Sequence, residues 1–446
     1  MEAKFTQGSI LNHVTTMTFA STIGLMAIFL VDLVDMYWLS LLGVVELAAA
    51  VGYAGSILFL TTSLTIGLSI GCGALVSKSV GSGDQKRTQE MVMHIFMSVA
   101  AICVPVLLLL LFFLQPFLEM LGASGEALGF AKQYLYIVLP SMPIMAIAMA
   151  CGGVSRALGF AKQSMWLTLI GGLVNAVLDP FFIFTLDLGV QGAAIATFIS
   201  RIVMLAYGLY LVIKVNELIN WPNFSHYFDD VKRYATIALP ASATNLSTPI
   251  AVGFVTAAMA QFGDNAVAAN AVISKLQPLA FAGLFALSGA IGPIAGQNLG
   301  AGQFNRVYDT LNKSLLFVFL YCVVACGLLF LLSGFILKAF EVAPESQTLI
   351  LWFCFGLSTV FVFNGITFVT NAMFNNLDAA KWATIFNFAK ATVFTIPFVS
   401  FGAKFGGPVG IFVGLYIGSV IVAGLGLWKN YLVIRALEMK SKRLTE

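Results

Sequence analysis

Carboxylates occur inside two otherwise apolar segments of the chain. Asp32 and Asp35 lie in the first segment, and Asp179 lies in the fifth, four residues after Asn175. A charged side chain at the centre of a bilayer costs roughly 3 kcal/mol on insertion scales. Two carboxylates that meet in a low-dielectric site cannot both stay charged cheaply, so one of them should hold a proton. A nearby amide could hydrogen-bond either form. This combination predicts a site that takes up and releases H⁺ or a small cation.

The expected depths of these residues support one shared site. Asp35 and Asp179 each lie about six residues from the outer end of an outward-running helix, at 1.5 Å of rise per residue. Thr197 lies about eight residues from the outer start of an inward-running helix. All would therefore sit roughly 9–12 Å below the outer ends of their helices. We expect Asp35, Asn175, Asp179 and Thr197 to form a proton- or cation-coupling cluster.

Further residues could join this cluster. Asp32 precedes Asp35 by three positions and points to nearly the same helix face. Pro180 cannot donate to the carbonyl four residues back, which frees the Ala176 carbonyl as a ligand. Arg201 follows Thr197 by one turn. In the alternative interpretation, Asp35 and Asp179 only bridge helices, with Arg201 between them.

The composition indicates an integral membrane protein. Of 446 residues, 59% are hydrophobic and 10% are charged, whereas a soluble domain carries about 25% charged residues. The mean hydropathy is +0.95. The apolar runs have about the length of a membrane-spanning helix, and β-barrel strands would be about half as long. The N-terminus lacks the pattern of a cleavable signal peptide, so the first apolar run is expected to be a true span.

The hydrophobic pattern predicts twelve transmembrane helices. They are expected near 13–41, 47–76, 91–116, 128–153, 161–185, 190–213, 233–260, 267–295, 309–337, 347–373, 380–402 and 407–434. Of the 23 Lys and Arg residues, seventeen fall on one side of this topology and three on the other. The excess of positive charge marks the cytoplasmic side. Both termini are therefore expected in the cytoplasm, in a multi-pass protein of the cytoplasmic (inner) membrane.

The two halves of the chain repeat each other. Residues 71–87 align with 290–306, and 189–192 align with 407–410, at an offset near 219. Because six spans is an even number, both halves enter from the same side, as in the parallel repeats of transporters. We expect lobes at 1–213 and 233–446, a cytoplasmic linker at 214–232, and a basic cytoplasmic tail. Asp32, Asp35 and Asp179 align with Val252, Val255 and Ile396, so the acids belong to the first half only.

The remaining motifs favour no enzyme class. Lys275 and Lys390 lie inside predicted spans, as polar positions that face the helix bundle. The sequence from Gly81 to Asp84 matches the G-x-G-D motif of intramembrane aspartyl proteases, but it falls in a basic loop and is expected to be a turn. The six cysteines lie in apolar runs without metal-ligand spacing and are expected to be buried small residues. We expect no enzyme activity, no cofactor and no metal centre, although Na⁺ could occupy the coupling cluster.

Taken in order, these features resemble the MATE (multidrug and toxic compound extrusion) family. The resemblance is carried by the twelve spans in two parallel sixes, Leu33-Val-Asp35, Asn175-x-x-x-Asp179-Pro180 and the Gly-x-Gly loops after spans two and eight. Acids confined to the first lobe resemble the DinF-like subgroup. The resemblance implies two six-helix lobes in a V around a central cleft. The first-span proline of many members is absent here, where Phe19 or Ala20 stands, which leaves Gly24 as the soft point.

The resemblance further implies an antiporter that exports small organic compounds, often cationic or amphipathic, by alternating access. We expect H⁺ as the coupling ion, with Na⁺ as an alternative. A lipid-linked precursor flippase of the same superfamily is the other candidate. The expected partners are small organic substrates and membrane lipid, not nucleic acid, and we expect a monomer.

Overall fold

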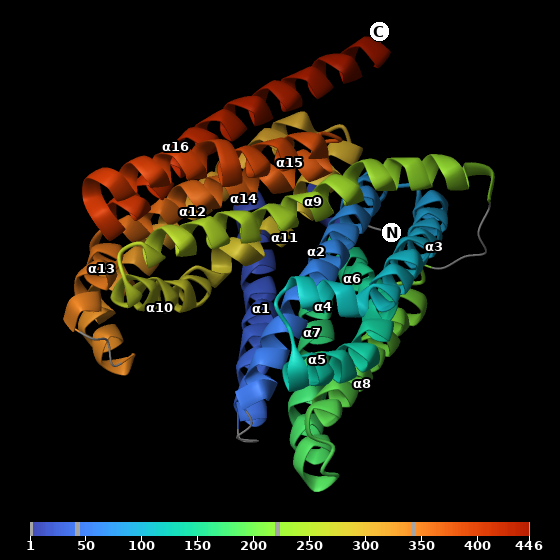
Figure 1. The fold of residues 1–446 in the computed structure, drawn as a ribbon. Helices are drawn as coiled ribbons and strands as arrows, with labels where there is room; N and C mark the ends of the chain where they lie inside the picture. The colour runs from blue at the N-terminus through green and yellow to red at the C-terminus, as the bar shows by residue number, and fades with distance from the viewer. Residues whose placement is uncertain (1–2, 41–44, 219–223, 341–343, 446) are drawn as a thin grey trace. The chain divides into compact units, whose positions relative to one another are not determined.

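The computed structural model describes residues 3–40, 45–218, 224–340 and 344–445; the side chains of 31–37 are among those outside this description. The described chain is helical throughout and has no β-strand. Its helices, labelled in Figure 1, form two compact units. The first unit comprises residues 23–242, and the second comprises residues 3–22 together with 243–446. The prediction of an all-helical membrane protein with two lobes is confirmed.

The first unit is built from helices that follow the first six predicted spans. They are α1 (Ile10–Ser40), α2 (Val45–Gly81), α3 (Gln85–Phe112), α4 (Leu114–Met120), α5 (Gly125–Val138), α6 (Met142–Ala157), α7 (Ala161–Pro180) and α8 (Gly189–Tyr210). The fourth span is divided between α5 and α6 by a 3-10 turn, Leu139–Ser141. The fifth and sixth spans end in π-helical turns, η3 (Phe181–Thr185) and η4 (Leu211–Val215). Such π turns are often found at functional sites.

The second unit repeats this plan over the last six predicted spans. Its helices are α9 (Tyr227–Ala260), α10 (Asp264–Ala280), α11 (Ala282–Gly300), α12 (Phe304–Ala339), α13 (Pro344–Phe355), α14 (Val360–Asn376), α15 (Ala380–Ala389) and α16 (Thr395–Thr445). A π turn, η7 (Lys390–Phe394), joins α15 to α16. Within α16, Gly407 has a non-helical backbone at φ 58°, ψ −145°. This left-handed conformation suits glycine, and it separates the eleventh span from the twelfth.

Several helices are long and apolar enough to cross a membrane. Nine in the described part of the chain meet this criterion, and the pair α10–α11, bent by 46°, makes ten if it is one span. One of the nine, Ala380–Arg443, contains both predicted spans on either side of Gly407. Each of the twelve predicted spans coincides with a helix or with consecutive helices.

Two helices contribute to both compact units. The division falls between Thr22 and Ile23 in α1 and between Ser242 and Ala243 in α9. These positions are 242 − 22 = 220 residues apart, which matches the offset of the sequence repeat. The units therefore differ from the predicted lobes of 1–213 and 233–446, because the first helix of each half packs partly in the other unit.

Small residues bring α9 against α2 in the first unit. A Cβ atom built on Gly67 would lie 2.3 Å from the Ser242 nitrogen, and one on Gly71 would lie 2.7 Å from the Ala238 Cβ. Small residues four positions apart on both helices allow close backbone approach inside a membrane. The Tyr234 hydroxyl adds a hydrogen bond of 2.9 Å to the Leu68 carbonyl. The start of α9 is thus fixed tightly to the first unit.

A buried ionic group also fixes the start of α9. Arg87 donates from both terminal nitrogens to Asp230, with Nη1 2.9 Å from Oδ2. His94 Nδ1 lies 2.7 Å from the same carboxylate oxygen, and the side chains of His94 and Asp230 are completely buried. Tyr227 packs edge-on against the His94 ring at 5.4 Å. Sequence reasoning did not predict this group, because Asp230 lies 136 residues from His94.

The repeat partner of Arg87 plays a matching part in the second unit. Arg306 donates to the carbonyls of Phe5, Gln7 and Gly8 at 2.7, 3.0 and 3.0 Å. Asn298 accepts from its Nε at 2.9 Å and itself donates to the Phe5 carbonyl at 3.1 Å. Arg87 binds the first turn of α9, and Arg306 binds the chain just before α1, so each of the two repeated arginines fixes the start of the first helix of a half.

Candidate functional site

The predicted coupling residues lie where α7 and α8 pack closely together. A Cβ on Gly171 of α7 would lie 2.3 Å from Met204 Sδ of α8, and one on Gly192 of α8 would lie 2.7 Å from the backbone of Phe182. In two antiparallel helices, the residue numbers of facing positions add up to a nearly constant value. The facing pairs 171/204 and 182/192 add up to 375 and 374, so α7 and α8 run antiparallel. Residue 179 is then level with about 196, so Thr197 lies beside the level of Asp179. The packing therefore sets Thr197 and Asp179 at one level along these two helices.

Contacts of α1 place it along α7 in the same unit. A Cβ on Gly24 would lie 2.8 Å from Thr168 Oγ1, and Trp38 packs against Phe184 with ring centroids 6.0 Å apart. The offsets, 168 − 24 = 144 and 184 − 38 = 146, describe two helices that run in parallel. At these offsets the backbone of Asp35 is level with residues 179–181. The side chains of Asp32 and Asp35 lie outside the described residues.

Asn175 and Asp179 are the two predicted cluster residues whose side chains are in direct contact in the described part of the chain. Asn175 Nδ2 donates to Asp179 Oδ1 at 3.0 Å, and the two residues are 6% and 1% exposed. A carboxylate this deep in an apolar helix requires hydrogen-bond or charge partners. The π turn begins directly after Pro180, so the helix is altered beside this carboxylate. Ala176 lies in α7, four residues before Pro180, the last residue of that helix.

Two other predicted members have partners elsewhere. Thr197 is half-buried, and its hydroxyl donates to the Ala193 carbonyl of its own helix at 3.0 Å. Arg201 Nη1 donates to Ser141 Oγ at 2.8 Å. Among the described side chains, no ion pair joins Arg201 to Asp179. The arrangement therefore joins Asn175 to Asp179 directly, holds Thr197 at their level and directs Arg201 to the break between α5 and α6.

The G-x-G-D sequence has a structural role. Asp84 precedes α3, and its carboxylate accepts from the Arg87 backbone N–H at 2.9 Å. This is an N-terminal helix cap, as expected for a turn. Five of the six cysteines are buried and the sixth, Cys326, is half-buried. No group of His, Cys, Asp and Glu side chains able to hold a metal ion is found among the described residues.

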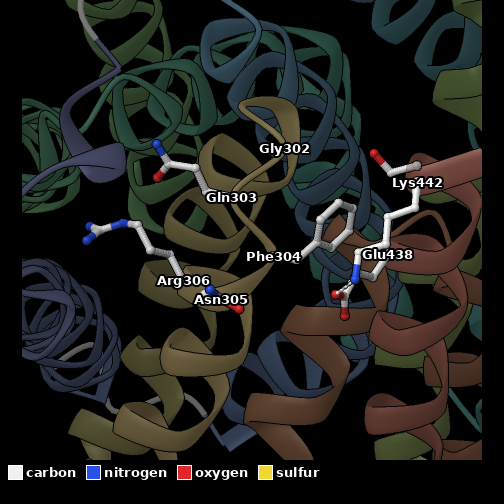
Figure 2. Close-up of a pocket in the computed structure, with 8 residues that line it drawn as sticks. Gly302, Gln303, Phe304, Asn305, Arg306, Glu438 and Lys442 are labelled. Atoms are coloured by element: carbon white, nitrogen blue, oxygen red, sulfur yellow. Dashed lines mark hydrogen bonds and ion pairs between the residues drawn. The ribbon is translucent and has the colours of Figure 1, made fainter. Parts of the chain in front are cut away.

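A separate cavity of about 620 Å³ lies in the second unit, between the start of α12 and the end of α16 (Figure 2). It is lined by Gly302, Gln303, Phe304, Asn305, Arg306, Glu438, Ser441 and Lys442. Lys442 pairs with Glu438 at 2.7 Å, and the Arg306 side chain points away from these two residues (Figure 2). Asp179 belongs to the other unit, so this cavity is not the predicted coupling site.

The fold and these residues define a multi-pass helical membrane protein with a buried carboxylate–amide pair inside a span. Comparison with known proteins places it further. The MatE family model matches residues 20–181 and 240–400. The chain therefore belongs to the MATE family, which confirms the resemblance seen in the sequence. The DinF-like subgroup stays a prediction.

Relatives match along nearly the whole chain. A protein of Shewanella oneidensis named FAD transporter is 24% identical over 95% of this chain and 94% of its own length. The multidrug export protein MepA of Staphylococcus haemolyticus is 22% identical over 99% of this chain and 98% of its own. The family and these relatives are transporters, and no relative named here is an enzyme.

Solved structures share the fold. A MATE structure in the bent conformation matches with a TM-score of 0.92 and 22% identity, over 99% of both chains. The Vibrio cholerae MATE transporter VcmN matches with a TM-score of 0.88 and 23% identity, over 96% of this chain and 98% of its own. These likenesses establish the helical fold of the chain.

Proposed function

We propose that this protein is an antiporter that exports small organic compounds and uses H⁺ as its coupling ion. The observation that carries the proposal is the pair Asn175–Asp179, buried inside a span and joined by one hydrogen bond. The backbone of Asp35 is level with that of Asp179 along two parallel helices, which supports the proposal that these two carboxylates share a proton. A site that changes its protonation is what couples transport to a proton gradient.

The names of the relatives support export of organic molecules. They include multidrug export proteins and an FAD transporter. By the distribution of Lys and Arg, the protein would reside in the cytoplasmic membrane with both termini inside, and we propose that it works as a monomer. Na⁺ at the same cluster is the alternative coupling ion, since carboxylate, amide and hydroxyl oxygens also suit small cations.

The test is efflux driven by a pH gradient in everted membrane vesicles. Asp179→Asn keeps the size of the side chain but removes its charge, so export should fall to background while the protein stays folded. Asp35→Asn should behave in the same way. Asp187→Asn is the matched control, because Asp187 is an exposed carboxylate beyond the same helix. Wild-type efflux by Asp179→Asn would refute the coupling role.

Two further measurements separate the alternatives. Substrate-induced dissipation of a preset pH gradient, with and without sodium, distinguishes H⁺ from Na⁺. A lipid-flipping assay on the reconstituted protein tests the flippase alternative, which predicts movement of a lipid-linked precursor and no drug efflux.

A further inference from the structure

A lysine lies near the middle of a membrane span in the second unit. Lys390 is ten residues from the predicted inner end of its span at Ala380, roughly 15 Å along the helix. The hydrocarbon core is about 30 Å thick, so this ammonium group lies close to the midplane. Snorkelling to the interface serves lysines near helix ends. Lys390 therefore needs compensation inside the protein.

The second half of the chain offers no carboxylate for this purpose. The sequence has no Asp or Glu in 265–308, 310–340, 346–377 or 379–437, so the one acid in the predicted spans from the eighth to the twelfth is Asp309, the exposed first residue of the ninth. The seventh, 233–260, has none either. A buried charge is normally paired with an opposite charge. The charge partner of Lys390 must come from outside the spans of its own unit.

One neutral group contacts the ammonium. Lys390 Nζ donates to Asn364 Oδ1 at 2.6 Å, its one hydrogen bond among the described residues. Asn364 lies nine residues from the predicted inner end of its span, about 14 Å, which is the same depth. Both residues are half-buried, so part of their surface is open to a molecule that is not the protein. An amide oxygen orients an ammonium group but does not neutralise it.

The surroundings of the pair have further features of a binding site. Lys390 begins the π turn η7, and π turns occur frequently at functional sites. Asn371 and Asn375 follow Asn364 on α14 at spacings of seven and eleven, which places all three on one helix face. The Oδ1 atoms of Asn371 and Asn375 are buried and have no hydrogen-bond partner among the described residues. This face offers polar atoms from the midplane toward the cytoplasmic end.

We propose that Lys390 and Asn364 form a substrate subsite that binds an anionic group, a carboxylate or a phosphate, on the exported compound. The inference rests on the proposed export function and narrows its substrate class. The anion completes the charge pair that the second unit lacks, and the side-chain amides of α14 hydrogen-bond the polar part of the molecule. The first unit carries acids for coupling and the second carries a cation for cargo.

Binding to the purified protein in lipid nanodiscs tests this subsite without any ion gradient. The probes are riboflavin and riboflavin 5′-phosphate, which differ by one phosphate. Because a hydrogen bond to a charged group is worth a factor of about ten to a hundred, the wild type should bind the phosphate that much more tightly. Lys390→Gln should remove this preference and leave riboflavin affinity unchanged. Lys390→Met provides a second neutral variant if the first folds poorly.

Two control variants should retain the preference for the phosphate. Lys390→Arg keeps the positive charge, and Lys275→Gln removes an exposed lysine from another span of the same unit. The proposal would be overturned if the wild type bound both flavins with equal affinity or bound neither. It would also be overturned if Lys390→Gln lost the same amount of affinity for both flavins. The last result would mean that Lys390 only bridges α14 and η7. A retained preference in Asp179→Asn, together with lost export, would separate cargo binding from coupling.

Discussion

Removing Arg87 should destabilise the protein more than neutralising the aspartate that it binds. The Asp230 and His94 side chains are completely buried, whereas the Arg87 side chain is 26% exposed. In Asp230→Asn the guanidinium can regain hydration. In Arg87→Ala the Asp230 carboxylate stays buried, and of its two side-chain partners Arg87 and His94 it keeps only His94.

The expected magnitudes follow from this asymmetry. Breaking a buried ion pair by removing one partner costs roughly 3–5 kcal/mol. The loss in Arg87→Ala should stop near 4 kcal/mol, because protonating an ordinary aspartate at pH 7 costs about that much. Asp230→Asn loses charge-assisted hydrogen bonds, about 1.5–3 kcal/mol, but leaves no buried charge. The double variant should therefore be more stable than Arg87→Ala alone, by about 1 kcal/mol.

The assay is reversible unfolding of the purified protein in mixed micelles, with the free energy of unfolding measured for the singles and the double. Lys442→Ala is the control. It breaks an ion pair to Glu438 whose lysine side chain is 71% exposed, and such pairs contribute at most about 1 kcal/mol. Equal losses in the two single variants, or a double variant whose loss equals their sum, would refute the reasoning.

Three further outcomes are expected. Gly192→Ala should lower the free energy of unfolding by about 1–3 kcal/mol, because its Cβ would meet the Phe182 backbone at 2.7 Å. The control Gly55→Ala, whose Cβ would have no atom within 4 Å, should leave the free energy of unfolding unchanged. Unfolding curves of the two variants check this. Arg306→Ala should release the chain around 5–8, measured as faster hydrogen exchange of those amides, and unchanged exchange would contradict its role as their anchor. Thr197→Val should leave stability within about 0.5 kcal/mol but weaken proton-driven efflux, and full efflux would remove Thr197 from the coupling site.

Several features of the candidate site were accessible to sequence reasoning because they depend on spacing along a helix. Asn175 and Asp179 are four residues apart, so an α-helix brings them to one face, and the structure joins them by a hydrogen bond. The position of Thr197 along its span predicted that it would be level with Asp179, and the packing of α7 on α8 places the two at one level. Lys390 was visible as a cation inside a span, although its partner was not.

The sequence by itself determined the membrane-spanning helices, the internal repeat and the restriction of intramembrane acids to the first half. These depend on composition, on 1.5 Å of rise per residue and on the order of residues in the chain. Tertiary structure decided which distant residues meet. The structure pairs residues that are 26 to 301 positions apart in the sequence. These pairs are Asp230 with Arg87 and His94, Asn364 with Lys390, and Arg306 with the chain at Phe5. No local pattern encodes such pairings, because they arise only when helices pack and bring together polar groups from distant parts of the chain.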